Sequence, residues 1–381
     1  MNTKHEDKYL FTKDNMPIVY ETAQKILEVT DKKIALSLPL TWETLSLIDA
    51  IKEKIPNLMV IPQSSGYSSS TQDGVFLYLK KWNVKYWKTA KDEDRIELLK
   101  QNPDIIVDCS LVLCETALKY NLLPKETIII EDTKTGENRI EEIHINNPYI
   151  ILDNGSLKRE YENRFGIGYS VIAALMSLGF FLPKYKIGII GYGKVGEGVA
   201  RFARGLGCTV LVCEIDKGRA ESAKEFCEVV DKNELLKRSN IVITAAGKNV
   251  LRREDFINLD KTIYLANAGG EDEWIREELF GKEKGVRIHP HIEEYIVEKC
   301  KIREAGEGNS LNLAVGISVS SFLDVTFSHL ILILERVLHV QLKNGKNDID
   351  IVESKDLIEK MKSEGSFRQL SGSLWQWTHT N

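Results

Sequence analysis

A glycine-rich turn between an apolar segment and a helical segment constrains this chain more than any other feature. The residues Gly-Tyr-Gly-Lys-Val-Gly at 191–196 follow the apolar run 185–190 and precede the amphipathic run 200–204. In such a turn the first glycine permits a tight bend, the second lets the backbone approach a phosphate, and the third permits close helix packing. Backbone N–H groups at the helix start attract anions. The turn predicts a dinucleotide site that includes Gly191, Gly193, Lys194, Val195 and Gly196.

An acidic residue follows the next apolar segment. Glu214 comes directly after the apolar residues 209–213, about 20 residues beyond the first glycine. A carboxylate at this point accepts a hydrogen bond from a ribose 2′-hydroxyl and repels a 2′-phosphate, which favours NAD over NADP. A glycine-rich turn without a ligand is the alternative, but the strand, helix and carboxylate together weigh against it. We therefore expect NAD as the cofactor.

Apolar, strand-like segments alternate with amphipathic, helix-like segments in two tandem runs. In the first run the strand candidates are residues 33–37, 58–61, 84–87, 104–107 and 127–130, with helical patterns at 42–54, 74–82 and 92–101. The second run starts at residue 185 and continues through 209–213, 241–244 and 262–266 to 286–288. This alternation predicts an α/β fold with two Rossmann-like, doubly wound parallel-sheet domains joined by long helices.

Two long helical patterns, residues 158–182 and 311–342, connect the two runs. The expected organisation is a substrate-binding domain at 1–157, an NAD-binding Rossmann domain at 158–310, a helix returning to the substrate domain at 311–342, and a polar C-terminal tail at 343–381. Within the returning helix, the apolar residues 331–334 are either core or a subunit interface.

Composition and charge indicate a cytoplasmic enzyme with a small-molecule substrate. The formal net charge of −5 gives no electrostatic reason to expect nucleic acid or an anionic membrane as partner. The polar N-terminus does not resemble a signal peptide, and no apolar stretch is long enough to cross a bilayer. The six cysteines lack paired metal-binding spacing, so we expect reduced thiols and no metal site.

Several further segments fall in a recognisable order along the chain. They are residues 69–73 (Ser-Ser-Thr-Gln-Asp), 131–136 (Glu-Asp-Thr-Lys-Thr-Gly), 158–166 (Lys-Arg-Glu-Tyr-Glu-Asn-Arg-Phe-Gly), 214–216 (Glu-Ile-Asp), 267–270 (Asn-Ala-Gly-Gly) and 307–313 (Glu-Gly-Asn-Ser-Leu-Asn-Leu). Together with the glycine turn, this ordered set resembles the S-adenosylhomocysteine hydrolase (adenosylhomocysteinase) family over most of residues 35–330. The resemblance implies tightly held NAD and a homodimer or homotetramer.

The resemblance also implies a reaction in which NAD oxidises a nucleoside 3′-hydroxyl, which makes the 4′-proton acidic, before elimination and addition at the 5′ carbon. Lys158 matches the lysine that contacts the 3′-hydroxyl, and a positive nicotinamide nearby would lower its pKa toward that of a base. A solvated pair of Lys158 and Glu162 is the alternative. The other expected catalytic residues are Glu162, Asn163, Asp132 and Asp108. The resemblance adds Thr133, Thr135, Gly247, Asn267 and Asn312 to the cofactor-binding residues.

Four substrate-side positions depart from the family pattern. Pro39 replaces a histidine, Cys109 replaces an aspartate, and both Gly270 and the segment 316–320 (Gly-Ile-Ser-Val-Ser) lack a family histidine. His289 and His291, which flank Pro290, can be read as replacement bases, but an exposed loop role is favoured. The lysine and tyrosines that end the family's chain have no clear match in the tail.

The kept cofactor residues and the altered substrate positions favour a diverged member that oxidises or reduces a secondary alcohol, with Lys158 as base. The alcohol belongs to a nucleoside, a sugar or a modified peptide. The first alternative is true S-adenosylhomocysteine hydrolysis, giving adenosine and homocysteine. The second is a non-catalytic NAD-binding subunit with a regulatory or structural role, although Lys158, Glu162 and Asn163 together argue against it.

Overall fold

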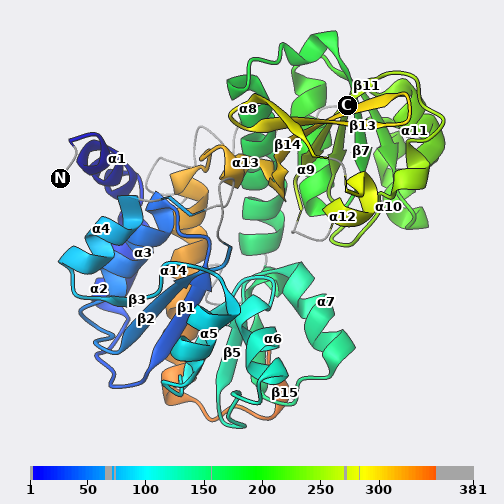
Figure 1. Ribbon diagram of the computed structural model, residues 1–381. Coiled ribbons are helices and arrows are strands. Elements are labelled where there is room, and N and C mark those ends of the chain that lie inside the picture. The colour runs from blue at the N-terminus through cyan, green and yellow to red at the C-terminus, as the bar shows by residue number, and fades with distance from the viewer. Residues whose placement is uncertain are drawn as a thin grey trace.

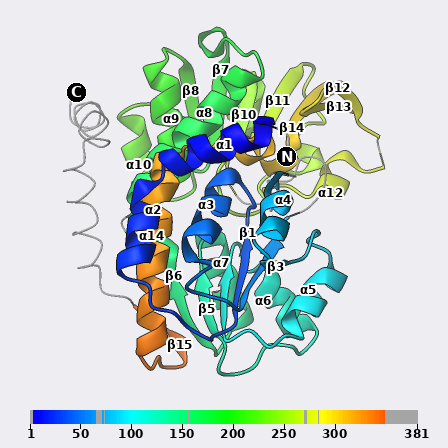
Figure 2. The same ribbon diagram turned by 90° about the vertical axis from the view of Figure 1, so that its left-hand side faces the viewer.

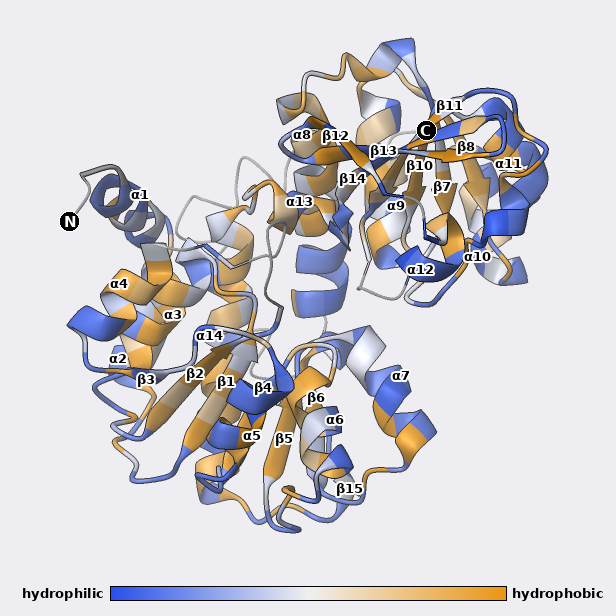
Figure 3. Ribbon diagram, viewed as in Figure 1, coloured by the Kyte–Doolittle hydropathy of each residue, from blue (hydrophilic) through white to orange (hydrophobic). Residues whose placement is uncertain are grey.

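Two β-sheets, each flanked by helices, make up the computed structural model, which describes residues 3–64, 71–72, 74–155, 157–269, 273–282 and 284–348. The sheets occupy separate lobes (Figure 1). Apolar residues concentrate in the strands and on the helix faces that cover them, while the outer helix faces are polar (Figure 3). No helix among the described residues is both long and apolar enough to span a membrane.

The first sheet is parallel throughout, with strand order β15-β6-β5-β4-β1-β2-β3. Its strands are β1 (Ile34–Leu38), β2 (Leu58–Pro62), β3 (Lys85–Tyr86), β4 (Ile105–Asp108), β5 (Ile128–Glu131), β6 (Pro148–Ile151) and β15 (Gly345–Lys346). The helices of this part are α1 (Thr3–Asp14), α2 (Pro17–Lys25), α3 (Trp42–Ile51), α4 (Gly74–Lys81), α5 (Asp92–Leu99), α6 (Val112–Lys119) and α7 (Lys134–Ile143). The central strands are apolar on both faces because helices cover both.

The second sheet has the order β12-β13-β14-β11-β10-β7-β8-β9. Its strands are β7 (Lys186–Ile190), β8 (Thr209–Cys213), β9 (Glu228–Val229), β10 (Ile241–Thr244), β11 (Thr262–Asn267), β12 (Val286–His289), β13 (Ile292–Val297) and β14 (Cys300–Ser310). Its helices are α8 (Gly168–Ser177), α9 (Lys194–Gly205), α10 (Lys217–Lys224), α11 (Lys232–Arg238) and α12 (Arg276–Phe280). The six strands from β14 to β9 are parallel, whereas β12 and β13 add an antiparallel edge.

Each sheet has a point at which the strand order changes direction. In the first sheet this point lies between β1 and β4, and in the second it lies between β7 and β10. Open α/β sheets bind ligands in the crevice outside the carboxyl ends of the strands at such points. The residues that follow these four strands, Pro39, Cys109, Gly191 and Ala245, all line one cavity. The two crevices therefore open into a shared site.

The first connection between the sheets is a π-helical segment, Leu157–Ile167, followed by α8. It is not the single helix over 158–182 that the sequence pattern predicts, because the hydrogen-bonding pattern changes at Gly168 and α8 ends at Ser177. This connecting segment packs closely on α9, where a Cβ on Gly198 would overlap the carbonyl oxygen of Arg164. A Cβ on Gly168 would approach the carbonyl carbon of Gly198 to 2.6 Å. The connecting segment is thus tightly joined to the second sheet.

The return connection is broken rather than continuous over 311–342. A short helix, α13 (Leu311–Ala314), ends before Gly316, whose φ of +71° interrupts helical geometry, and α14 (Ser320–His339) follows. Helix α14 runs beside α2 in the first lobe (Figure 2). The carboxylate of Asp324 accepts hydrogen bonds from the backbone N–H groups of Ile18 and Val19 at the start of α2.

The sequence left open whether the apolar residues 331–334 are core or a subunit interface, and the structure places most of them in the core. Ile331, Ile333 and Leu334 are at most 2% exposed and belong to the core of the first lobe, whereas Leu332 is only partly buried. The polar tail predicted at 343–381 contributes strand β15 to the first sheet, and residues 349–381 lie outside the described residues. The segment 69–73 and Gly270 fall largely or wholly outside the described residues as well.

Candidate functional site

The glycine turn forms a strand-to-helix loop with room for a ligand. Gly191 has a φ of +95°, and a Cβ there would come within 2.5 Å of the Ala245 carbonyl oxygen. Gly196 packs so closely on the Gly191 carbonyl that no side chain fits, while a Cβ on Gly193 would meet nothing within 4 Å. Gly193 is the N-cap of α9, so the open space lies where backbone N–H groups face a phosphate. This loop fits the pyrophosphate of NAD.

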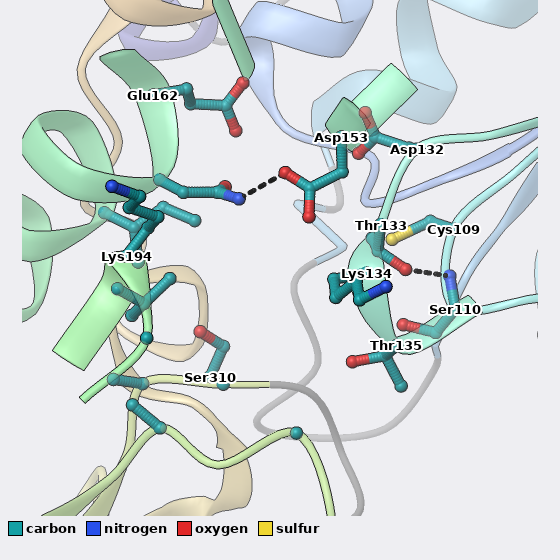
Figure 4. Close-up of a pocket in the computed structure, with 18 of the residues that line it drawn as sticks. Cys109, Ser110, Asp132, Thr133, Lys134, Thr135, Asp153, Glu162, Lys194 and Ser310 are labelled. Carbon is teal, nitrogen blue, oxygen red and sulfur yellow. Dashed lines mark hydrogen bonds between the residues drawn. The ribbon is translucent and has the colours of Figure 1, made fainter. Parts of the chain in front are cut away.

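Lys194, the first residue of α9, adds positive charge to the loop. Its Nζ lies 2.9 Å from Glu160 Oε1, and both Lys194 and Val195 line the cavity. Figure 4 shows Lys194 and Ser310 on one side of the cavity and Asp132, Thr133, Cys109 and Ser110 on the other.

Glu214 braces the glycine turn from the end of β8. One carboxylate oxygen accepts from the Tyr192 N–H over 2.6 Å, and the other accepts from Asp216 N–H over 2.8 Å and from the Arg219 guanidinium over 3.2 Å. Burial alone would raise the pKa of Glu214, but these hydrogen bonds outweigh it and lower the pKa. The residue is therefore a carboxylate on the cavity wall, as recognition of a ribose hydroxyl requires.

Most of the other expected cofactor residues line the same cavity. Thr133, Thr135, Gly247 and Asn312 are on its wall, and Gly247 has a φ of +67° with its N–H bonded to the buried carboxylate of Glu273. Asn267 is different, because it is completely buried and does not line the cavity. Its amide donates to the Gly308 carbonyl over 2.8 Å and accepts from Gly269 N–H over 2.7 Å. Asn267 thus supports the cofactor wall from behind.

Lys158 lies at the centre of a buried ionic cluster where the connecting segment meets the first sheet. Its Nζ is 3.0 Å from Asp132 Oδ2 and 2.7 Å from Glu162 Oε1, and its side chain is almost fully buried. Burial alone would lower the pKa of Lys158, but the two carboxylates outweigh this effect and raise it. The two carboxylates therefore favour the ammonium form of Lys158, and the lowered pKa expected beside a positive nicotinamide stays a prediction. The Lys158–Glu162 pair is buried, so the alternative of a solvated pair is wrong.

A third carboxylate, which the sequence did not single out, joins this cluster. Asp153 is 5% exposed, lines the cavity, and accepts a hydrogen bond from the Asn163 amide over 2.6 Å (Figure 4). Burial raises the pKa of Asp153 to about 7, and repulsion from Asp132 and Glu162 adds to the effect. Three carboxyl groups thus lie near one ammonium, and the raised pKa of Asp153 allows this carboxyl to exchange a proton near neutral pH.

Asp108, expected to be catalytic, is placed elsewhere. It is completely buried, does not line the cavity, and accepts hydrogen bonds from the N–H groups of Leu113 and Cys114 over 2.9 and 2.8 Å. Burial raises the pKa of Asp108 to about 6. These contacts are those of a carboxylate that caps the start of α6, so the structure gives Asp108 a structural position in place of the expected catalytic one.

The turn that follows Asp108 carries unusual backbone conformations. Ser110 and Leu111 have φ of +60° and +59°, a region that costs a non-glycine residue about 1–2 kcal/mol. The buried carboxylate of Glu131 holds this turn by accepting from both of their N–H groups, over 2.9 and 3.0 Å. Cys109, a buried residue of this turn, lines the cavity, and burial raises the pKa of its thiol well above its usual value.

Two of the altered substrate positions lie on the cavity wall. Pro39 and Cys109 line the cavity and present no titrating group to it near neutral pH. None of the described residues that line the cavity is a histidine. His289 and His291 lie at the turn between β12 and β13, away from the cavity. Without an imidazole, the described part of the wall offers carboxylates as its acid and base groups, and Asp132, Asp153 and Glu162 are the ones around Lys158.

The cavity has a volume of about 1110 Å³ and is lined by residues from both lobes. Drug-sized ligands occupy pockets of roughly 300–1,000 Å³, so this space suits a dinucleotide with a second small molecule. The open loop at Gly193 and the carboxylate of Glu214 give the NAD end, and the Lys158 cluster lies at the junction of the lobes. The residues present fit NAD.

Comparison with known proteins agrees with this site. The model of the S-adenosyl-L-homocysteine hydrolase NAD-binding domain matches residues 163–318. Proteins named S-inosyl-L-homocysteine hydrolase from Methanopyrus kandleri and Methanocaldococcus jannaschii are each 27% identical to this chain. The matches cover 90% and 93% of this chain and 85% and 89% of those proteins. The adenosylhomocysteinase of Thermococcus kodakarensis is 30% identical over 317 residues, which are 78% of this chain and 74% of that protein. With its NAD-type turn and matching relatives, the chain belongs to the S-adenosylhomocysteine hydrolase family of NAD-binding enzymes.

Proposed function

We propose that this protein uses NAD to oxidise and reduce a secondary hydroxyl of a nucleoside, with the Lys158 cluster handling the hydroxyl proton. In this proposal the second sheet holds NAD and the first sheet holds the substrate. The observation that carries it is the placement of Lys158, Asp132 and Glu162 on a cavity wall that also includes the cofactor turn. The names of the relatives, S-inosyl-L-homocysteine hydrolase and adenosylhomocysteinase, support a nucleoside over a sugar or a peptide.

The proton has a defined path in this arrangement. Because Lys158 is an ammonium, it accepts a proton only after giving one away, and Glu162 Oε1 lies 2.7 Å from its Nζ. Burial raises the pKa of Glu162, so this carboxylate is able to hold the proton. When bound, NAD supplies the hydride acceptor and a positively charged nicotinamide. A positive charge beside Lys158 favours the neutral amine, which then takes the hydroxyl proton of the substrate.

The decisive test compares Lys158→Met with Arg159→Met. Arg159 is the next residue, is exposed at the cavity and also carries one positive charge, so its replacement controls for the loss of charge. Each protein is incubated with NAD and adenosine or inosine, and the reduced cofactor and keto-nucleoside are measured. We expect Lys158→Met to lose at least about 100-fold in turnover while keeping NAD affinity within about threefold. Equal turnover in both variants would remove Lys158 from the reaction.

A second candidate is complete hydrolysis of a nucleosyl-homocysteine thioether, as the names of the relatives indicate for those proteins. Asp153 favours it, because burial raises the pKa of this carboxyl to about 7 and so provides an acid and base in a wall without described histidines. Mass spectrometry after incubation with S-adenosylhomocysteine or S-inosylhomocysteine separates the candidates. Free homocysteine indicates hydrolysis, and a keto-nucleoside without homocysteine indicates the redox step alone. NAD binding without any product indicates a binding subunit.

A further inference from the structure

The loop after β10 forms part of the cofactor wall and is held from behind by one buried carboxylate. Glu273 is completely buried and does not line the cavity. Its Oε2 accepts from the Ala246 N–H over 3.0 Å, and its Oε1 accepts from the Gly247 N–H over 2.6 Å. The backbone carbonyl of Glu273 accepts from the Val250 N–H over 2.9 Å. Glu273 thus holds both ends of the loop 246–250.

Gly269 leaves the space that this carboxylate occupies. A Cβ on Gly269 would lie 2.2 Å from Oε1 of Glu273, so a larger residue there would displace the carboxylate. Gly269 lines the cavity, and its N–H donates to the side chain of Asn267 at the end of β11. The carboxylate of Glu273 therefore lies between two segments of the cofactor wall, one after β10 and one after β11.

These hydrogen bonds also set the direction of two backbone carbonyls. In a trans peptide bond the C=O and N–H groups point in opposite directions. Because the N–H groups of Ala246 and Gly247 point at Glu273, the carbonyls of Ala245 and Ala246 point away from it. The Ala245 oxygen lies against the glycine turn, 2.5 Å from the place of a Cβ on Gly191. Ala246 lines the cavity, and its carbonyl accepts no hydrogen bond from the backbone of the described residues, so it is available to a ligand.

The strand order indicates which part of NAD meets this carbonyl. Strands β8, β7 and β10 are neighbours in that order, and they are followed by Glu214, the glycine turn and the loop 246–250. If Glu214 binds the ribose next to adenine and the glycine turn binds the pyrophosphate, the second ribose lies at the loop after β10. Gly247 also reaches the first lobe, since a Cβ on it would lie 3.8 Å from Thr135 Oγ1.

We propose that Glu273 is a positioning residue for NAD, which holds the Ala246 carbonyl toward the hydroxyl groups of the ribose next to nicotinamide. A hydroxyl donates to a carbonyl, whereas an ionised phosphate has no proton to donate, so this acceptor suits the ribose and not the pyrophosphate. N–H bonds to a carboxylate are stronger than those to a neutral oxygen, which suits a residue that fixes a loop. The inference concerns cofactor binding alone and is independent of the reaction proposed for this site.

The test measures how binding depends on the second ribose. The full chain is equilibrated with radiolabelled NAD, which is then displaced by unlabelled NAD, ADP-ribose, ADP or AMP. ADP-ribose keeps the second ribose without the nicotinamide, whereas ADP ends at the pyrophosphate. The proteins are the wild type, Glu273→Gln, Glu273→Met and the control Glu278→Met. Glu278 is an exposed residue of α12 that does not line the cavity. Urea unfolding of each protein reports changes in stability separately.

We expect Glu273→Met to weaken the binding of NAD and ADP-ribose by about 10-fold or more, and that of ADP and AMP by less than about threefold. Glu273→Gln keeps one acceptor oxygen, so it should weaken NAD and ADP-ribose by about threefold and leave ADP unchanged. Glu278→Met should bind all four ligands as the wild type does.

A purely structural role of Glu273 would weaken all four ligands by the same factor, and that result would overturn the proposal. Unchanged NAD affinity in Glu273→Met would overturn it too, as would a wild type that binds ADP-ribose no more tightly than ADP. If Glu273→Met does not fold, the same comparison of ADP-ribose with ADP in Glu273→Gln decides the question. None of these measurements requires a substrate to be oxidised or cleaved.

Discussion

The charge balance around Lys158 is tested most directly by Asp153→Asn. Asp153 is 5% exposed and accepts its hydrogen bond from the Asn163 amide, a bond that an asparagine of the same shape is able to accept. Burial raises the pKa of this carboxyl to about 7 from an ordinary value near 3.8. Each unit of pKa difference corresponds to about 1.4 kcal/mol, so ionising Asp153 costs the folded state up to about 4 kcal/mol.

Because the pKa of Asp153 is raised in the folded state, the free energy of unfolding depends on pH. Below about pH 4 the carboxyl is protonated in the folded and unfolded states, so it has no effect on the free energy of unfolding. Between about pH 4 and pH 7 only the folded state keeps the proton, and stability therefore falls as pH rises. The substitution removes this loss. Relative to the wild type, Asp153→Asn should gain little near pH 4 and about 2–4 kcal/mol by about pH 8.

The measurement is urea unfolding of both proteins at several pH values and one fixed NAD concentration. Other buried carboxyls titrate in the same range, since burial also raises the pKa of Asp108 to about 6 and of Glu304 to about 7. The difference between the two proteins cancels these contributions. Asp260→Asn, at an exposed position, is the control and should show no such trend. A stability difference that stays constant from about pH 5 to pH 8 would refute the reasoning.

Two further changes test how the cofactor side is built. Gly198→Ala should destabilise the fold by about 1–3 kcal/mol or more in chemical unfolding, because its Cβ would overlap the Arg164 carbonyl oxygen. Gly218→Ala in α10 is the control, since its Cβ would come no closer than 3.4 Å to a neighbour, and equal effects of the two changes would contradict the close packing described. Glu214→Gln should raise the affinity for NADP relative to NAD by at least about tenfold, as judged by equilibrium binding, because a like charge beside the 2′-phosphate is removed. Glu221→Gln, at an exposed side chain on α10, should leave that ratio unchanged, and an unaltered ratio in Glu214→Gln would exclude the carboxylate from cofactor choice.

Sequence patterns predicted the centre of each sheet because buried parallel strands need continuous apolar runs. Strands such as β1 and β10 are buried along their whole length, and their Ile, Val and Leu residues make them visible. Strand β6 begins with Pro148, and β13 and β14 mix apolar with charged residues, although each of these strands is paired on both sides. Those strands were missed because their burial depends on neighbours that a local pattern does not contain.

The candidate site was predictable where backbone geometry dictates residue type. The glycines of the turn are required by a positive φ at Gly191 and by close packing at Gly196. Charge placement was harder to predict, because an aspartate at the end of a strand suits either a helix cap or a catalytic site. Asp108 proved to be a cap, whereas Asp153, which follows the unrecognised strand β6, faces the cavity. Only the fold distinguishes these two environments.

The two partners of Lys158 come from different parts of the molecule. Glu162 lies on the same π-helical segment, which is joined tightly to α9 and the second sheet, whereas Asp132 follows β5 of the first sheet. Asn163 and Asp153 repeat this division, with one partner on each side. Any change in the relative placement of the lobes would alter these two contacts and leave the Lys158–Glu162 pair intact. The proton affinity of Lys158 therefore depends on how the first lobe is placed relative to the second.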